Sequence, residues 1–86
     1  MKDNLDRETV VWLKDGDYRK SVLKLLKDKS LLSSEIAKEL KIHRSSTSRL
    51  LKKLVERGLI ESIASKSRTV EYSLTPKGKK YLIYFW

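Results

Sequence analysis

The stretch that most constrains the fold of this chain runs from Ser33 to Lys52 and reads SSEIAKELKIHRSSTSRLLK. Its first part places Ile36, Ala37 and Leu40 on one side of a helix, because their spacing follows the helical period. Its second part has the same period, so the residues between the two parts must form a turn, with the apolar Ile42 expected inside. The stretch therefore predicts two short helices joined by a tight turn.

The second of these helices has two chemically different faces. Ser33 is the expected N-cap of the first helix, and the second is expected to run from His43 to about Arg57 and to end at Gly58. At about 100° per residue, its inward face consists of Thr47, Leu50, Leu51 and Leu54. The opposite face carries Ser45, Ser48, Arg49 and Lys52, with Arg44 and Ser46 on the flanks. The pattern predicts a core helix whose exposed side is polar and cationic.

The flanking segments predict further helices and a hairpin. Helical periods precede the central stretch, and two strand-like runs follow it, joined by the polar loop Ser65-Lys66-Ser67-Arg68. Thr75-Pro76 is a helix start, since Thr can cap and Pro fits the first helical position. The expected helices lie at Leu5–Lys14, Asp17–Lys27 and Pro76–Trp86, and the expected strands at Leu59–Ser65 and Thr69–Leu74, with a further brief strand expected at Leu31 and Leu32.

The charge of the chain favours a polyanionic partner. It has 20 Lys and Arg against 11 Asp and Glu, a formal net charge of +9 on only 86 residues, enough for one small domain. Neutralising phosphates with such cations releases counterions, which drives binding to nucleic acid. The alternative is a solvated surface that happens to be basic.

The residue inventory argues against an enzyme. There is no cysteine, only one histidine, no glycine-rich phosphate loop and no cluster of acids that suggests a metal centre. We therefore expect no catalytic residues, no metal and no cofactor. The N-terminus lacks the apolar core of a signal peptide, and the C-terminal run YLIYFW is too short to span a bilayer, so a cytoplasmic protein without membrane contact is expected.

These elements and motifs resemble the MarR-type and related archaeal-style winged helix-turn-helix regulators. The run SSEIAKELKIHRSSTSRLLKKLVERGLIE followed by YSLTPKG carries the resemblance, which covers about Val10 to Leu82. It implies an α+β, mainly α, winged helix-turn-helix domain over residues 1–86. Its helix-turn-helix would span 33–57, its wing 59–75 and its C-terminal helix 76–86. The resemblance also implies sequence-specific binding of double-stranded DNA by a small transcriptional regulator.

The resemblance also implies which residues bind. The second helix would enter the major groove, with Arg49 reading bases and Lys52 and Lys53 on phosphates. The wing loop would reach the flanking backbone or minor groove. The expected DNA-binding residues are His43, Arg44, Ser45, Ser46, Ser48, Arg49, Lys52 and Lys53 on the helix, and Lys66, Ser67 and Arg68 on the wing. The alternatives are an ordinary solvated helix face and a basic pair that protects a hairpin edge from aggregation.

Two positions depart from the family pattern. Lys41 stands at a turn position that is often Gly, and a Lys there costs on the order of 1 kcal/mol if the backbone needs a positive φ. Thr47 stands where Val or Ile usually packs, although its methyl group can do the same.

The aromatic residues near the two ends suggest a homodimer. Members of the resembled group commonly pair through terminal helices, and the chain has more aromatic surface than a domain of this size usually buries. The expected interface residues are Trp12, Tyr81, Ile83, Tyr84, Phe85 and Trp86. The alternative is that the last helix packs on the first helix and closes the core of a single chain.

One rival function belongs to another class. A winged helix can serve as a protein-interaction module in a transcription or replication assembly, but such modules often lose positive charge on the second helix of the motif. The cations retained at Arg44, Arg49, Lys52 and Lys53 argue against that function here. No small-molecule effector can be inferred from the sequence.

Overall fold

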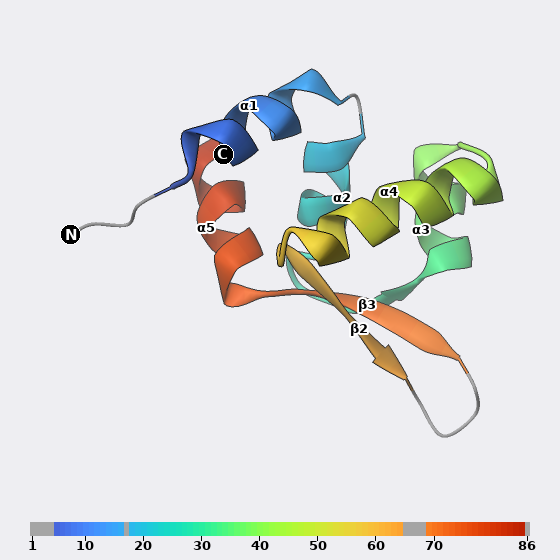
Figure 1. Ribbon diagram of the computed structural model, residues 1–86. Coiled ribbons are helices and arrows are strands. Elements are labelled where there is room, and N and C mark those ends of the chain that lie inside the picture. Colours follow the sequence, from blue (N-terminus) through green and yellow to red (C-terminus); the bar gives the residue numbers. More distant parts are fainter. Residues whose placement is uncertain (1–4, 17, 65–68, 86) are drawn as a thin grey trace.

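The computed structural model describes residues 5–16, 18–64 and 69–85 of the chain. Within these residues the chain forms five helices and a three-stranded antiparallel sheet (Figure 1). The helices are α1 (Arg7–Asp15), α2 (Arg19–Leu25), α3 (Ser33–Leu40), α4 (Arg44–Glu56) and α5 (Pro76–Phe85). The strands are β1 (Leu31–Leu32), β2 (Ile60–Ala64) and β3 (Val70–Leu74). The expected winged helix-turn-helix class is confirmed.

The sheet has one strand more than the expected hairpin. β2 and β3 pair antiparallel, and β1 pairs with the other edge of β3, giving the order β1-β3-β2. In that pairing Leu31 lies opposite Tyr72, and Leu32 lies opposite Glu71. The brief strand expected at Leu31 and Leu32 is confirmed, but its pairing with β3 was not predicted, because two residues show no alternation that would specify a partner strand. The loop 65–68 at the tip of the hairpin lies outside the described residues.

The core is built from the inward faces of the helices and the base of the wing. Leu13, Ile36, Leu54 and Leu59 are completely buried, and each comes from a different part of the chain. The other buried apolar residues are Val22, Leu23, Leu26, Leu31, Ala37, Leu51, Ile60, Tyr81 and Leu82. Leu51 and Leu54 of α4 belong to this core, and Leu50 and Val55 are partly buried against it.

Several helix starts differ from expectation. α1 begins at Arg7 rather than Leu5, and α4 begins at Arg44 rather than His43, which is its N-cap. α2 begins at Arg19 rather than Asp17, which lies outside the described residues, and it ends at Leu25. The N-cap of α3 is Leu32 rather than Ser33, since Ser33 is already the first helical residue. Leucine has no acceptor to offer, but the Glu35 carboxylate accepts a hydrogen bond from the Leu32 N–H at 2.8 Å. That bond supplies one half of a capping box.

The wing is attached to its neighbours by a small cluster of backbone contacts. Gly58 has φ +76°, a left-handed conformation that ends α4 and that glycine adopts at little cost. The Thr75 hydroxyl lies 2.6 Å from the Gly58 carbonyl oxygen and 2.9 Å from that of Leu59, and it accepts a hydrogen bond from the Gly78 N–H at 3.0 Å. Thr75 therefore caps α5 and ties it to the start of the wing, as the Thr-Pro motif predicted for the cap.

The two terminal helices are joined within the chain. The Asp6 carboxylate caps α1 by accepting hydrogen bonds from the backbone and the hydroxyl of Thr9, at 3.3 and 2.8 Å. The hydroxyl bond is the main reason that the pKa of Asp6 is below its usual value. The Asp6 N–H also donates to the Tyr81 hydroxyl of α5 at 2.7 Å.

Tyr81 was expected at the dimer interface, and the structure corrects that expectation. Its side chain is only 2% exposed and packs in the core of the single chain. It therefore cannot offer a surface to a second subunit, and the alternative of a core-closing helix holds for this residue. Ile83 and Tyr84 on the same helix remain exposed.

The turn between α3 and α4 places Lys41 in a left-handed conformation, with φ 58° and ψ 43°. It is the only non-glycine residue with positive φ among those described. The cost of about 1 kcal/mol in stability that was expected for Lys41 if its φ is positive therefore applies.

Replacing Lys41 by glycine is expected to stabilise the protein by about 1 kcal/mol, because glycine adopts this conformation without steric conflict. For a domain of this size that corresponds to a rise in Tm of about 4–8 °C in a thermal unfolding experiment. Lys38→Gly is the matched control, because it makes the same change inside α3 and should lower stability by about 1 kcal/mol. Effects of equal sign at the two positions would contradict the argument.

Candidate nucleic-acid interface

The first turn of α4 is fixed by Thr47. The His43 carbonyl oxygen accepts hydrogen bonds from both the Thr47 backbone N–H and the Thr47 hydroxyl, each at 2.9 Å. Because the hydroxyl is satisfied locally, Thr47 can be 1% exposed and still leave its methyl group for packing. The expected inward role of Thr47 is confirmed.

The periodicity of α4 separates its two faces as expected. Leu51 and Leu54 are buried with Thr47, and Leu50 is half-buried. The side chains of Ser45, Ser48, Arg49 and Lys52 are all exposed. At about 100° per residue these four fall within roughly a third of the helix circumference. They form one continuous outward strip, which we call the α4 strip.

The α4 strip combines short and cationic side chains. Ser45 and Ser48 project little beyond the backbone, so a partner can approach the helix closely. Arg49 and Lys52 make no interaction with another described residue, so their charges are available to an external partner. Glu56 lies on the same side near the end of the helix and limits the cationic part to the first three turns.

The other expected residues of α4 flank the strip. His43 and Arg44 are exposed at the start of the helix. Ser46 borders a hollow of about 240 Å³ shared with Tyr18 and Arg19, and Lys53 borders a second one shared with Trp12 and Arg57. Ser46 and Lys53 therefore lie on the side of α4 that faces the first two helices. Lys66, Ser67 and Arg68 of the wing lie outside the described residues.

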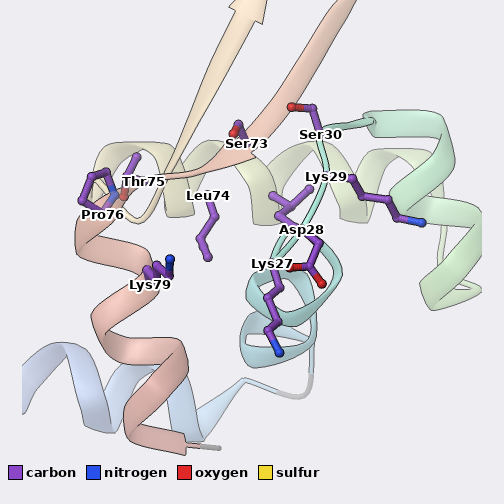
Figure 2. A pocket seen from close by; sticks show the side chains of 10 residues that line it. Lys27, Asp28, Lys29, Ser30, Ser73, Leu74, Thr75, Pro76 and Lys79 are labelled. Carbon is purple, nitrogen blue, oxygen red and sulfur yellow. The ribbon is translucent and has the colours of Figure 1, made fainter.

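A larger hollow lies away from α4 (Figure 2). It has a volume of about 530 Å³ and lies between the end of α2, the end of β3 and the start of α5. Its lining residues are Leu26, Lys27, Asp28, Lys29, Ser30, Ser73, Leu74, Thr75, Pro76 and Lys79. The hollow shares no residue with the α4 strip, so it is not part of the same site.

The described residues provide neither a metal site nor a membrane span. Among residues 5–16, 18–64 and 69–85, no three His, Asp or Glu side chains are grouped so that they could hold a metal ion. None of the helices in these ranges is long and apolar enough to cross a bilayer.

A helix-turn-helix on a small core, followed by a β-hairpin, defines the winged helix class of proteins. Residues 21–68, more than half of the chain, match the model of the MarR family. The chain belongs to the MarR family.

Two relatives come from Methanocaldococcus jannaschii. One is an uncharacterized HTH-type transcriptional regulator, 39% identical over 67 residues that cover 73% of this chain and 63% of the relative. The other is an uncharacterized protein, 40% identical over 73 residues that cover 79% of this chain and 61% of the relative. The chain thus spans about three fifths of the length of these relatives.

Solved structures share the fold. A mutant of Lactococcus lactis ZitR is 30% identical and superimposes with a TM-score of 0.75, over 81% of this chain and 49% of that one. The S. aureus MepR–DNA complex superimposes with a TM-score of 0.79, over 91% of this chain and 68% of that one. At 24% identity the second likeness concerns the fold alone.

Proposed function

We propose that this chain is a transcriptional regulator that binds double-stranded DNA with α4 in the major groove. The α4 strip carries the proposal, because the apolar residues of the helix are buried or half-buried while Ser45, Ser48, Arg49 and Lys52 are exposed. A major groove about 12 Å wide admits a helix of this kind. Membership of the MarR family and the regulator among the relatives support the same function.

Each residue type on α4 has a distinct task in this proposal. The planar guanidinium of Arg49 can donate to both acceptors of a guanine, which gives base discrimination. Lys52 and Lys53 bind phosphates as flexible point charges, and Arg44 does so from the start of the helix. Ser45, Ser46, Ser48 and the helix cap His43 complete the surface that approaches the groove.

The wing loop adds a second contact. Lys66, Ser67 and Arg68 follow β2 after Ser65, and the residues just before β2 are held to the start of α5 by the Thr75 hydroxyl. We propose that these residues reach the backbone or the minor groove beside the site read by α4.

The assembly we propose is a homodimer formed through the terminal helices. Ile83 and Tyr84 on α5 are 66% and 58% exposed, and Val11 on α1 is 49% exposed. Large apolar side chains with so much exposure favour burial against a second copy in so small a domain. Phe85 and Trp86 extend this surface in the proposal, although Trp86 lies outside the described residues.

The rival protein-interaction module receives less support. The cations of α4 are retained and unpaired within the described residues, whereas a module that binds protein has no need of them. Family membership also favours a regulator over an enzyme.

Selection of bound duplexes from a random pool tests the function and the assembly together. We expect enrichment of one sequence in two inverted copies, centred about 10 base pairs or a multiple of that apart, because a symmetric dimer reads two half-sites. Affinity for the selected duplex should fall steeply with salt, since each phosphate contact releases counterions. Absence of any enriched sequence would contradict the DNA-reading function, whereas enrichment of a single copy would contradict the homodimer only.

A further inference from the structure

Trp12 connects the first helix to the end of α4. The Arg19 guanidinium carbon lies 4.1 Å from the centroid of the Trp12 ring, and that of Arg57 lies 4.2 Å from it. Arg19 also donates a hydrogen bond to the Trp12 carbonyl oxygen. We call these three residues, which come from α1, α2 and the C-cap of α4, the Trp12 bridge.

The same end of α4 is also held by α5. Arg57 is the C-cap of α4, and its carbonyl oxygen accepts a hydrogen bond from the Lys77 ammonium at 2.9 Å. α5 is in turn joined to α1 by the bond between Asp6 and Tyr81. α1 therefore contacts the end of α4 through Trp12, the end of α4 contacts α5 through Lys77, and α5 contacts the start of α1 through Tyr81. The C-terminal end of α4 is fixed to the two helices that carry the exposed apolar side chains.

The chemistry of the bridge is suited to holding an orientation. A cation is attracted to the face of an indole ring, so a guanidinium that moves off the ring loses the attraction. An aliphatic side chain at position 12 would keep an apolar contact with the core, although a smaller one, and would offer no such face. The ring of Trp12 therefore helps to hold the direction of the Arg57 side chain at the C-cap of α4.

We propose that the Trp12 bridge is a positioning device that sets the separation at which a dimer reads its two half-sites. This rests on the proposed function. When one half-site is bound, the second binding event is intramolecular, and its effective concentration is greatest when the link between the two reading helices matches the span. A stiff link gives a sharp preference for one separation, and a loose link gives a broad one. Within one chain, that link runs from α4 through the Trp12 bridge to α1, and through the hydrogen bond between Lys77 and the Arg57 carbonyl oxygen to α5.

Duplexes that carry the selected half-site twice, at separations stepped by one base pair, test this proposal. The wild-type protein should prefer one separation sharply. Trp12→Leu, which keeps apolar bulk but removes the ring face, should reduce that preference by about 2- to 30-fold, the range expected from the loss of such an interaction. The loss should be clearly larger on duplexes with two half-sites than on a duplex with one, because the exposed residues of the α4 strip are unchanged.

A second variant tests the same proposal in case Trp12→Leu fails to fold. Arg57→Gln removes the guanidinium from the face of the Trp12 ring and keeps the backbone carbonyl oxygen that accepts a hydrogen bond from Lys77. It should reduce the preference for one half-site separation in the same way. Lys14→Gln is the matched control, because it removes one positive charge from exposed α1 outside the bridge and should leave the preference intact.

The outcomes separate the two proposals. An unchanged separation profile in both bridge variants would overturn the positioning role, and so would a wild type that binds without preferring any separation. Equal losses of affinity on single and double half-sites would also overturn it, since they indicate general structural support. A wild type that binds no duplex would overturn the proposed function itself, and the positioning role with it.

Discussion

Replacing Arg49 and Lys52 together by alanine is expected to weaken binding to the selected duplex by about 30- to 1,000-fold at moderate salt. Loss of a bidentate contact to a base accounts for about 1–3 kcal/mol, and loss of a charge on a phosphate adds to it. Both side chains are exposed and alanine is the best helix former, so α4 should persist in the variant. Fluorescence anisotropy of a labelled duplex measures the change.

The two single variants should change DNA binding in different ways. Arg49→Ala should relax the preference for one base pair of the site, whereas Lys52→Ala should weaken all duplexes alike and reduce the slope of log affinity against log salt by about one. Lys29→Ala is a control, because it removes an exposed cation that borders the hollow of Figure 2 rather than α4. If the double variant binds as tightly as wild type, the α4 strip is not the DNA-binding face.

Replacing Gly78 by alanine is expected to destabilise the fold by about 2 kcal/mol or more. A Cβ at this position would lie 2.0 Å from the Leu59 carbonyl oxygen and 2.8 Å from a methyl carbon of Leu74. The oxygen belongs to the backbone at the base of the wing, so the clash cannot be relieved by turning a side chain. Moving α5 away would also disturb the hydrogen bonds between Thr75 and its neighbours.

Thermal unfolding measures this effect. For a domain of this length, 2 kcal/mol corresponds to a fall in Tm of about 8–16 °C. Lys79→Ala is the control, because it makes an exposed substitution one residue further along the same helix and should change stability by less than about 0.5 kcal/mol. A Gly78→Ala protein as stable as this control would show that α5 and the wing are not packed as described.

The helical period of the apolar residues was enough to predict the helix-turn-helix from the sequence alone. The inward and outward faces of α4 follow from the spacing of Leu50, Leu51 and Leu54, and the burial of Leu51 and Leu54, with Leu50 half-buried, is a local consequence of the helical period. Thr75-Pro76 likewise predicted the start of α5 within one residue, because capping is a short-range effect. The polar and cationic composition of the α4 strip followed directly from these two kinds of signal.

The features that sequence reasoning missed depend on contacts between distant residues. A brief strand was expected at Leu31 and Leu32, but its pairing with β3, in which Leu31 lies opposite Tyr72, was not, because no local pattern specifies a distant partner strand. Tyr81 was expected at an interface because aromatic residues cluster near it. Its side chain is instead buried in the core, and its hydroxyl accepts a hydrogen bond from the backbone N–H of Asp6, near the other end of the chain. The Trp12 bridge also joins residues far apart in sequence, and neither Arg19 nor Arg57 carries a motif that points to it.

Site-directed crosslinking tests the central claim, that the outward face of α4 is the surface that meets DNA. The chain contains no cysteine, so a single introduced cysteine can be labelled uniquely with a photoactivatable group. One variant carries Ser48→Cys in the middle of the α4 strip, and the comparison variant carries Lys27→Cys beside the hollow of Figure 2. Irradiation with the selected duplex should crosslink the Ser48→Cys protein efficiently and the Lys27→Cys protein hardly at all. Equal crosslinking from the two positions, or a higher yield from position 27, would contradict the account.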